Sequence, residues 1–467
     1  MAIGIGLLGL GTVGAGVAAI LSSPEGRHPL VGDLALRRVA VRDPGRARAV
    51  SLDPNLLVTD PTLVVDDPAV DIVVEVMGGL EPARSLILRA IAAGKSVVTA
   101  NKAVIARYGE EIAAAAAARG VYVLIEAAVG GGIPIIEPLK QSLGGNRIRR
   151  VSGIVNGTTN YILSRMADEG AAYGEVLADA QRLGYAEADP AADVQGGDAA
   201  DKIAILAGLA YGGSIERTAI PTEGIDRLDA RDVAYAKELG YVVKLLAVAE
   251  RFEATASTAA MASPAAAAGP TDSVLALDVR VHPTLLPRAH PLAGVHGVNN
   301  AILVEGEPVG QVMFFGPGAG AGPTASAVVA DILNIAGIRQ LGAPAGALDP
   351  LLAASRWRQC ALVDGTRTRH RNYVRLLTRD EAGVIGKIGT AFGTAGVSIQ
   401  SIVQYEASGA GRGGGDSDSG GDSGGGGGGA EIVVITHEVE ESRFRQALAA
   451  ITAQPEVETV AACLRTL

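Results

Sequence analysis

Five carboxylates and a lysine are concentrated in one short stretch of a chain in which only 19% of the residues are charged. The stretch runs from Gly184 to Lys202, and its acids are Glu187, Asp189, Asp193, Asp198 and Asp201. A lysine held among carboxylates can exchange a proton with a carbinol oxygen, and carboxylates in a loop can hold an ammonium group. The alternative interpretation is a helix start that is only capped and salt-bridged.

The spacing of Asp198 and Lys202 places both side chains on one face of a helix predicted over residues 198–211. The same face continues with Ile205 and Leu209, so it becomes apolar, unlike a solvated stripe of charges. Lys202 also lies near the helix start, where the macrodipole disfavours a cation. The sequence therefore predicts a partly buried lysine–carboxylate pair that takes part in proton transfer.

A glycine-rich turn near the start of the chain has the spacing G-x-G-x-x-G, from Gly9 through Gly11 to Gly14. It follows a predicted buried strand and opens a predicted helix, the context in which this spacing binds a dinucleotide. Gly9 permits the tight turn, Gly11 lets the backbone approach a pyrophosphate, and Gly14 lets helix and strand pack closely. We expect the N–H groups of this helix start, at Thr12 and Val13, to bind the phosphates.

Charged residues after the second predicted strand bear on the choice between NAD and NADP. Arg42, Arg46 and Arg48 would favour the 2′-phosphate of NADP, whereas Asp43 would bind the ribose hydroxyl of NAD. Because three arginines lie here beside one acid, the sequence slightly favours NADP, and NAD stays an alternative. Arg42 is the arginine nearest to the strand. Solvated turn charges are the alternative for all four.

Lys102 ends the sequence Thr-Ala-Asn-Lys, directly after another predicted strand. Open α/β sheets bind their ligands beyond the carboxyl ends of the strands. A lysine at this place can contact cofactor and substrate together, and an ordinary surface lysine is the alternative.

The elements that must position these residues change along the chain. Strands and helices alternate in the first third, which predicts a Rossmann-type parallel sheet covered on both faces. Strands then follow one another more directly, which predicts an α+β domain with an open sheet. The last part has the order βαββαβ and its own core. The predicted fold class is therefore α/β.

The predicted domain boundaries follow from these changes. They are a nucleotide-binding domain at 1–145 completed by 318–346, a second domain at 146–317, a linker at 347–372, and a C-terminal domain at 373–467. Within the last, the Gly-rich residues 408–429 are predicted to form a disordered loop between two strands. A calcium site in that loop is the alternative.

Composition excludes several classes of protein. The net charge of −10 argues against a nucleic-acid partner, and two cysteines are too few for a disulfide framework. No apolar stretch is predicted to reach the roughly 20 residues that span a bilayer. The N-terminus enters a strand-like run with no basic region before it, so we expect no signal peptide and a cytoplasmic protein without a membrane partner.

Five motifs carry a resemblance to a known family: GLGTVG, TANK, EAAVGGGIP, NGTTNYIL and GYAEADPAADVQGGDAADK, in this order. Over residues 1–346 the chain resembles homoserine dehydrogenase, and residues 373–467 resemble an ACT domain. The resemblance implies reversible reduction of L-aspartate 4-semialdehyde to L-homoserine by NADH or NADPH, in threonine, methionine and isoleucine biosynthesis. It also implies that residues 146–317 bind substrate and dimerise, giving a homodimer or homotetramer.

The resemblance assigns roles to individual residues. Lys202 matches the catalytic lysine, and Lys102 matches a lysine that touches both cofactor and substrate. Glu187 matches a substrate-binding acid, while Asp193 and Asp198 match acids that line the same pocket, Asp198 beside the catalytic lysine.

Two further segments acquire a role through the resemblance. The family wraps a monovalent cation, usually sodium, in backbone oxygens, which here would come from Glu126, Val129, Gly131 and Ile133. The glycine-rich stretch around Gly318 resembles a segment close to the cofactor. A tight turn without an ion and a plain connection between domains are the respective alternatives.

The turn at residues 380–386 resembles the effector-binding turn of ACT domains. The implied effector is L-threonine, bound where two copies meet. Family members usually have proline where this chain has Ala382, and a domain that only supports oligomerisation is the alternative.

Two other functions fit the sequence less well. A semialdehyde dehydrogenase that forms a thioester needs a cysteine nucleophile, and neither Cys360 nor Cys463 falls at a strand end of the predicted catalytic domains. A non-enzymatic sensor that binds a dinucleotide would not need Lys202 or Glu187, and both are present.

Overall fold

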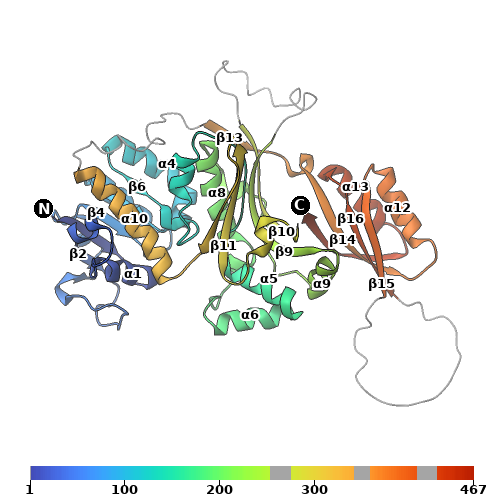
Figure 1. Ribbon diagram of the computed structural model, residues 1–467, viewed down its shortest axis with the longest axis horizontal. Helices are drawn as coiled ribbons and strands as arrows, with labels where there is room; N and C mark the ends of the chain where they lie inside the picture. The colour runs from blue at the N-terminus through green and yellow to red at the C-terminus, as the bar shows by residue number, and fades with distance from the viewer. Residues whose placement is uncertain (1, 253–274, 341–357, 407–428) are drawn as a thin grey trace, which may run out of the picture.

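The computed structural model describes residues 2–252, 275–340, 358–406 and 429–467. The molecule is elongated, with an N-terminal unit, a middle unit and a C-terminal unit in a row (Figure 1). The predicted Gly-rich loop at 408–429 lies almost wholly outside the described residues.

The N-terminal unit is built on a parallel sheet with the order β3-β2-β1-β4-β5-β6. Its strands are β1 (Ile3–Leu8), β2 (Leu34–Ala40), β3 (Leu57–Val58), β4 (Ile72–Glu75), β5 (Ser96–Thr99) and β6 (Val123–Leu124). Because β1 lies at the centre and the order reverses beside it, the loops after β1 and β4 open at one edge of the sheet. This confirms the predicted Rossmann-type sheet.

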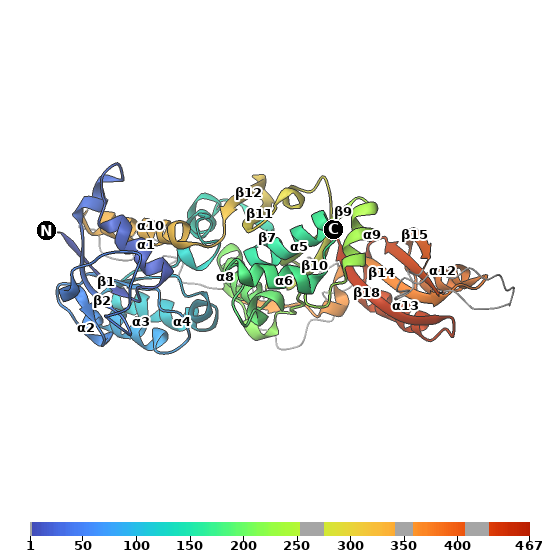
Figure 2. The same ribbon diagram turned by 90° about the horizontal axis from the view of Figure 1, so that it is seen from below.

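Helices cover both faces of this sheet, as Figure 2 shows. They are α1 (Thr12–Leu21), α2 (Thr62–Val65), α3 (Ala83–Ala92), α4 (Lys102–Arg119) and α10 (Ala321–Gln340). α1 and α10 share one hydrophobic cluster with the sheet, while α2, α3 and α4 share the cluster on the other face. Alternate strand residues, such as Val73 and Val74, enter opposite clusters, which is the pattern of a strand buried on both sides.

Helix α10 is the one helix of the described residues that is long and apolar enough to be compared with a membrane span. By length and composition it could cross a membrane, although the sequence pattern predicted no such stretch. Its apolar face is buried against α1 and the sheet, with Val328, Ile332 and Ile335 fully enclosed. α10 is therefore a core helix of the N-terminal unit, to which the chain returns after the middle unit.

The middle unit combines a mostly antiparallel sheet with helices on one face. The sheet contains β7 (Arg147–Ile154), β9 (Tyr241–Arg251), β10 (Leu275–Pro287), β11 (Asn299–Glu307) and β12 (Gly310–Pro317), in the order β12-β11-β7-β9-β10. The helices are α5 (Gly157–Glu169), α6 (Tyr173–Arg182), α7 (Ala191–Val194), α8 (Gly197–Tyr211) and α9 (Ala230–Glu238). The predicted open sheet is confirmed, whereas the short helices α7 and α9 were not predicted.

The stretch predicted as a linker contains regular structure. Strand β13 (Arg358–Leu362) pairs with β10 and with the short strand β8 (Gly213–Ser214). The next strand begins at Arg369, inside the predicted linker. Pairing with β10 explains this difference, because a five-residue strand added to an existing edge needs no periodic pattern of its own.

The C-terminal unit has the predicted βαββαβ order. Its elements are β14 (Arg369–Arg379), α12 (Val384–Thr394), β15 (Ile399–Glu406), β16 (Gly429–Thr436), β17 (Val439–Glu440), α13 (Glu441–Thr452) and β18 (Val457–Thr466). The antiparallel sheet has the order β18-β14-β16-β15, and α12 and α13 share its own core cluster. β18 also pairs with β10 at Thr284 and Leu285, so the sheets of the middle and C-terminal units are continuous.

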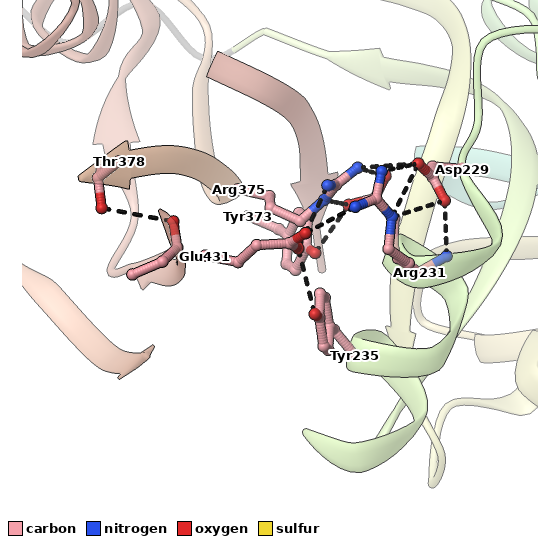
Figure 3. Close-up of polar contacts among 9 residues, drawn as sticks. Asp229, Arg231, Tyr235, Tyr373, Arg375, Thr378 and Glu431 are labelled. Atoms are coloured by element: carbon pink, nitrogen blue, oxygen red, sulfur yellow. Dashed lines mark hydrogen bonds and ion pairs between the residues drawn. The ribbon is translucent and has the colours of Figure 1, made fainter. Parts of the chain in front are cut away.

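A buried charge network joins α9 to the sheet of the C-terminal unit (Figure 3). The Arg375 guanidinium on β14 donates to both carboxylate oxygens of Asp232, at 2.6 and 3.0 Å, and to Glu431 at 3.3 Å. Tyr373 donates to Asp232, while Arg231 and Tyr235 donate to Glu431. Arg375, Asp232 and Glu431 are each about 1% exposed, so their charges are compensated within this network, in which Arg231 and Asp229 also take part.

Replacing Arg375 by Met should destabilise this junction strongly. The change leaves the carboxylate of Asp232 buried without its counter-charge and removes one of the two cations beside Glu431, which costs about 3–5 kcal/mol. Urea unfolding followed by circular dichroism would measure the loss. Arg379→Met is the matched control on the same strand, because the Arg379 side chain is 57% exposed and its ion pair is at the surface. Equal stability of the two variants would contradict the prediction.

Candidate active site

One carboxylate, that of Asp198, lies between the two lysines that the sequence singled out. Its Oδ2 accepts from Lys202 Nζ at 2.7 Å, and its Oδ1 is 3.0 Å from Lys102 Nζ. Lys202 is nearly buried, with 11% of its side chain exposed, whereas 38% of the Lys102 side chain is exposed. The predicted pair of Asp198 and Lys202 is therefore present on α8, and Lys102 reaches it from α4.

Asn156 is part of the same cluster, although no role was predicted for it. Its amide Nδ2 donates to Asp193 at 2.7 Å and to Asp198 at 2.9 Å, and its Oδ1 accepts from Thr159 N, which caps α5. The carbonyl of Val155, one residue earlier, accepts from Lys202 Nζ at 2.6 Å. The motif that contains Asn156 was recognised, and an Asn before a helix is a capping signal, but neither indicates a contact with Asp198.

The electrostatics of the cluster keep the Asp198 carboxylate charged. Burial opposes ionisation of Asp198, but the ammonium groups of Lys202 and Lys102 outweigh it and hold the pKa of the carboxyl well below its usual range. Asp198 in turn raises the pKa of Lys102, against the effect of burial. Burial raises the pKa of Asp193, and the charge of Asp198 adds to the rise.

A second pair of ions joins the same two helices. Asp201, one turn after Asp198 on α8, accepts from Arg107 of α4 at 3.3 Å and from Arg217 at 2.6 Å. Because α4 belongs to the N-terminal unit and α8 to the middle unit, the cluster lies where these two units meet. The relative position of Lys102 and Lys202 thus depends on this contact.

Glu187 and Asp189 do not join the cluster. Both are exposed, and the Glu187 carboxylate makes no hydrogen bond or ion pair with any described residue. Asp189 accepts from the backbone N–H of Ala191. Of the five acids in the stretch, the structure brings Asp193, Asp198 and Asp201 to the contact between units and leaves these two in the solvent-facing loop.

The glycine turn after β1 has the geometry expected of a dinucleotide-binding turn. Gly9 has a φ of +103°, which favours glycine, and a Cβ on Gly14 would lie 2.2 Å from the carbonyl of Gly9. A Cβ on Gly11 would meet nothing within 4 Å. Gly11 and Thr12 are exposed, and α1 begins there without a side-chain cap. The amides of this helix start, including that of Val13, are therefore open to a phosphate.

The charged residues after β2 are not equivalent. The Arg48 guanidinium donates to the carbonyls of Asp43, Pro44 and Arg46, so it is occupied in holding the turn. Asp43 accepts from Gly45 N with one carboxylate oxygen. Arg42 is exposed and its side chain makes no ion pair within the described part of the chain. The same holds for Arg46, so both guanidinium groups are available to a ligand, with Arg42 nearer to the end of β2.

A fully buried acid at the end of β4 orders the loops beside Lys102. Glu75 accepts from the backbone of Met77 and Gly78 and from the Thr99 hydroxyl. Asn101, which caps α4 directly before Lys102, donates to the carbonyl of Gly79. No role was predicted for Glu75, although it positions the start of α4 through Thr99.

The loop after β6 contains a carboxylate and several free carbonyl groups. The side chain of Glu126 accepts three backbone N–H groups, from Ile135, Ile136 and Glu137, so it shapes the loop from inside. Among the hydrogen bonds of the described loops and side chains, none ends on the carbonyl oxygen of Glu126, Val129, Gly131 or Ile133. These four oxygens suit a hard cation.

A group of three carboxyl groups lies behind this loop. Glu126, Glu137 and Asp331 each place an oxygen within 4.8 Å of the others. Asp331 accepts from Glu126 N, its second oxygen has no partner among the described residues, and burial raises its pKa well above the usual range. The Lys140 ammonium is 2.9 Å from Glu137. An uncharged Asp331 would relieve the repulsion in this group.

Gly318 lies against the same loop. A Cβ on Gly131 would be 2.3 Å from the Gly318 carbonyl, and a Cβ on Gly318 would collide with the Asn300 amide. Gly132 N donates to the carbonyl of Pro317, and Gly16 of α1 faces the carbonyl of Ala321. The segment before α10 thus connects the loop after β6 to the helix of the glycine turn.

Two family models match this chain. The model described as homoserine dehydrogenase matches residues 134–333, and the model described as homoserine dehydrogenase, NAD binding domain, matches residues 9–126. The homoserine dehydrogenase of Synechocystis sp. is 53% identical over 467 residues, which is all of both chains. That of Corynebacterium glutamicum is 39% identical over 466 residues, 99% of this chain and 95% of the relative.

Solved structures are similar as well. A crystal structure of a homoserine dehydrogenase from Thiobacillus denitrificans has a TM-score of 0.83 at 38% identity and covers 100% of this chain and 98% of its own. A hyperthermophilic archaeal homoserine dehydrogenase in complex with NADPH has a TM-score of 0.58 at 27% identity and covers 74% and 99%, respectively.

Removing the negative charge of Asp198 should make Lys102 more reactive. In Asp198→Asn the pKa of Lys102 loses the main cause of its rise, so more free amine is present at pH 8–9. Acetylation by acetic anhydride, quantified at Lys102 by mass spectrometry, should therefore be faster than in the unchanged protein. Asp201→Asn is the control, because Asp201 contributes less to this pKa. Equal rates in all three proteins would show that Asp198 does not govern the charge of Lys102.

Proposed function

This chain belongs to the homoserine dehydrogenase family, and we propose from this premise that it reduces L-aspartate 4-semialdehyde reversibly to L-homoserine. The observation that carries the proposal is the pair of ammonium groups, Lys102 and Lys202, held on the single carboxylate of Asp198. The pathway would be the biosynthesis of threonine, methionine and isoleucine.

The two lysines fit the needs of this reaction. When a carbonyl is reduced, negative charge develops on its oxygen and a proton must be delivered there. Lys202 Nζ has three N–H donors and uses two of them, on Asp198 and on the Val155 carbonyl, so one is left for the substrate oxygen. We assign the proton transfer to Lys202 and the contact to both substrate and cofactor to Lys102, which is more exposed.

Asp198 keeps the two ammonium groups close together. Without the Asp198 carboxylate between them, the ammonium groups of Lys102 and Lys202 would repel each other and separate. Both of its oxygens are occupied by Lys102, Lys202 and Asn156, which fixes its orientation before substrate arrives. Preorganised charge of this kind contributes to lowering the barrier when the oxyanion forms. Asp198 thereby acts on the reacting oxygen through the lysines.

Glu187 and Asp193 are the proposed ligands of the substrate's amino group. Asp193 is held towards the cluster by Asn156, whereas Glu187 is exposed and without a partner among the described residues. A carboxylate free of internal contacts can bind a substrate ammonium without first breaking an ion pair. Binding of substrate would then draw the loop of Glu187 towards Lys202.

The cofactor is a nicotinamide dinucleotide, and we propose that NADP is preferred over NAD. When bound, the nicotinamide supplies or accepts the hydride. The turn from Gly9 to Gly14 would hold the pyrophosphate, Arg42 the 2′-phosphate, and the segment at Gly318 would lie on the nicotinamide side.

A monovalent cation, sodium by preference, is proposed for the loop after β6. The four carbonyl oxygens from Glu126, Val129, Gly131 and Ile133 would bind it, and the carboxylate of Glu126 stiffens the loop around them.

Sodium chloride should therefore raise the midpoint of thermal unfolding more than tetramethylammonium chloride at the same ionic strength.

Regulation by threonine and assembly into a dimer or tetramer are proposed for the C-terminal unit. The turn before α12 contains Gly383 with a φ of +92°, and no side chain caps the start of this helix. Deleting the C-terminal unit is a poor test of regulation. The deletion would expose the buried Asp232 and leave the edge of β10 that pairs with β18 without its partner. Steady-state rates of the full chain with and without saturating threonine test the regulation directly.

Lys202→Ala should lower kcat for homoserine oxidation by about 10²–10⁴-fold, the range typical of a lost general acid–base. Lys202→Arg should also be slow, because a guanidinium keeps its proton near neutral pH. The rate is followed by absorbance of the reduced nicotinamide, and Arg182→Ala on the exposed side of α6 is the control. An arginine variant with nearly unchanged kcat would rule out proton transfer by Lys202.

Arg42→Ala should raise KM for NADPH by about tenfold and change KM for NADH little, because a charge-assisted contact to the 2′-phosphate is lost. Arg46→Ala is the matched control, since Arg46 is also exposed but lies further along the turn. The two cofactors are compared in the same steady-state assay. If both KM values rise equally, Arg42 does not discriminate between the cofactors.

A further inference from the structure

A pocket of about 320 Å³ lies in the middle unit, apart from the cluster around Asp198. It is bordered by the second half of α5, the end of α9, the start of β9 and the short helix at Pro291–Gly294. Three cationic side chains line it, from Lys237, Lys244 and Arg288, against one acid, Asp168. The formal charge of these four groups is three minus one, or +2, in a protein whose net charge is −10.

Lys244 lies buried beside this pocket with no anionic partner. It is 2% exposed, and its ammonium donates to Asn160 Oδ1 at 2.9 Å and to the carbonyl of Val295 at 2.5 Å. Both acceptors are neutral, and no carboxylate of the described residues lies within ion-pair distance. An ammonium has three donors, so one remains. A buried cation without an anion is costly, and a bound anion would offset that cost.

The pKa of Lys244 agrees with this geometry. Burial lowers it to about 8, and the charge of Asp168 offsets the effect only in part. The group is still an ammonium at pH 7, where it can bind an anion. Its two hydrogen bonds hold it at the base of the pocket, because Asn160 is itself fixed by donating to Val295 and Asn299.

The other two cations lie at the rim and are not neutralised. Lys237 donates to the carbonyl of Ala167 at 2.9 Å, and Arg288 donates to the carbonyl of Lys237 at 2.8 Å. Both side chains are exposed and neither forms an ion pair with a described residue. His296 adds a polar ring at the same rim. The carbonyl contacts orient the two side chains while leaving their positive charge available.

We propose that this pocket binds a small oxyanion, a phosphate or a small carboxylate, with Lys244 at its base and Lys237 and Arg288 at its rim. The volume of the pocket suits such a ligand. The buried ammonium of Lys244 supplies a charged hydrogen bond to the ligand at the base of the pocket. The Ser164 hydroxyl at the wall donates to the carbonyl of Asn160, so it is not free to donate to the ligand.

The position of the pocket links two regions described above. Asn156, which caps the start of α5, contacts Asp193 and Asp198, and the later turns of α5 form one wall of the pocket. α9 carries Lys237 and Val233 in another wall, while its Asp232 is bound by Arg375 of the C-terminal unit. An anion bound here would therefore touch both helices. The proposal does not depend on which reaction the enzyme catalyses.

Calorimetric titration of the full chain tests the proposal, with inorganic phosphate in one arm and malonate in the other. NADPH is kept saturating, so that the glycine turn is not available to the titrated anion, and ionic strength is constant. We expect saturable binding of at least one anion. The double variant K237Q/R288Q should weaken it about tenfold, since two exposed cations are lost.

The matched control is the double variant R27Q/R37Q, which removes the same charge from exposed positions of the N-terminal unit. Its affinity should equal that of the unchanged protein. Binding of phosphate alone or of malonate alone would support the site and identify the ligand group. Absence of saturable binding of both anions, or equal affinity in all three proteins, would overturn the proposal.

Discussion

The arrangement of the candidate active site depends on one interaction, the simultaneous pairing of Asp198 with two lysines. One lysine belongs to the N-terminal unit and the other to the middle unit, so the carboxylate defines how the two units meet. Three features hold Asp198 in position for this pairing. They are the hydrogen bond from the Asn156 amide, the start of α8, and the ion pair between Arg107 and Asp201 one turn further along α8. Loss of that carboxylate would affect the electrostatics and the geometry at once.

The middle unit has a comparable ionic junction at each end. At one end Asp198 and Asp201 face α4, and at the other Asp232 and Glu431 surround the Arg375 guanidinium. In both places buried carboxylates form ion pairs with cations from a different unit. Such pairs contribute little net free energy but are costly to break. They therefore favour one relative orientation of the units over others. Helices α8 and α9 of the middle unit each provide a carboxylate to one of the two junctions.

Features that depend on local pattern were predictable from the sequence, and those that depend on distant contacts were not. The glycine turn, the pairing of Asp198 with Lys202 and the βαββαβ order each follow from spacing within about 20 residues or from element order. The contacts of Asn156, Glu75 and Arg375 join segments that are 24 to 143 residues apart, and no local sequence pattern predicts such contacts. β13 was missed for the same reason, because its partner strand, not its sequence, makes it a strand. Glu187 was recognised by its motif, which says nothing of its exposure.

The continuity of the two sheets at β10 has a consequence for how the protein acquires its structure during translation. The later residues of β10 are covered by Arg465 and Thr466, and its first residues by β13, so both neighbours are synthesised long after β10 itself. Until they emerge from the ribosome, the two ends of β10 present unpaired backbone groups on this edge, whereas Val281 between them is already paired with Pro221 and Glu223. Such open stretches of a strand edge invite association with other chains. The early presence of β9 on its opposite side limits this exposure to one edge. Nascent chains that stall before residue 457 would therefore be the form of this protein most in need of a chaperone.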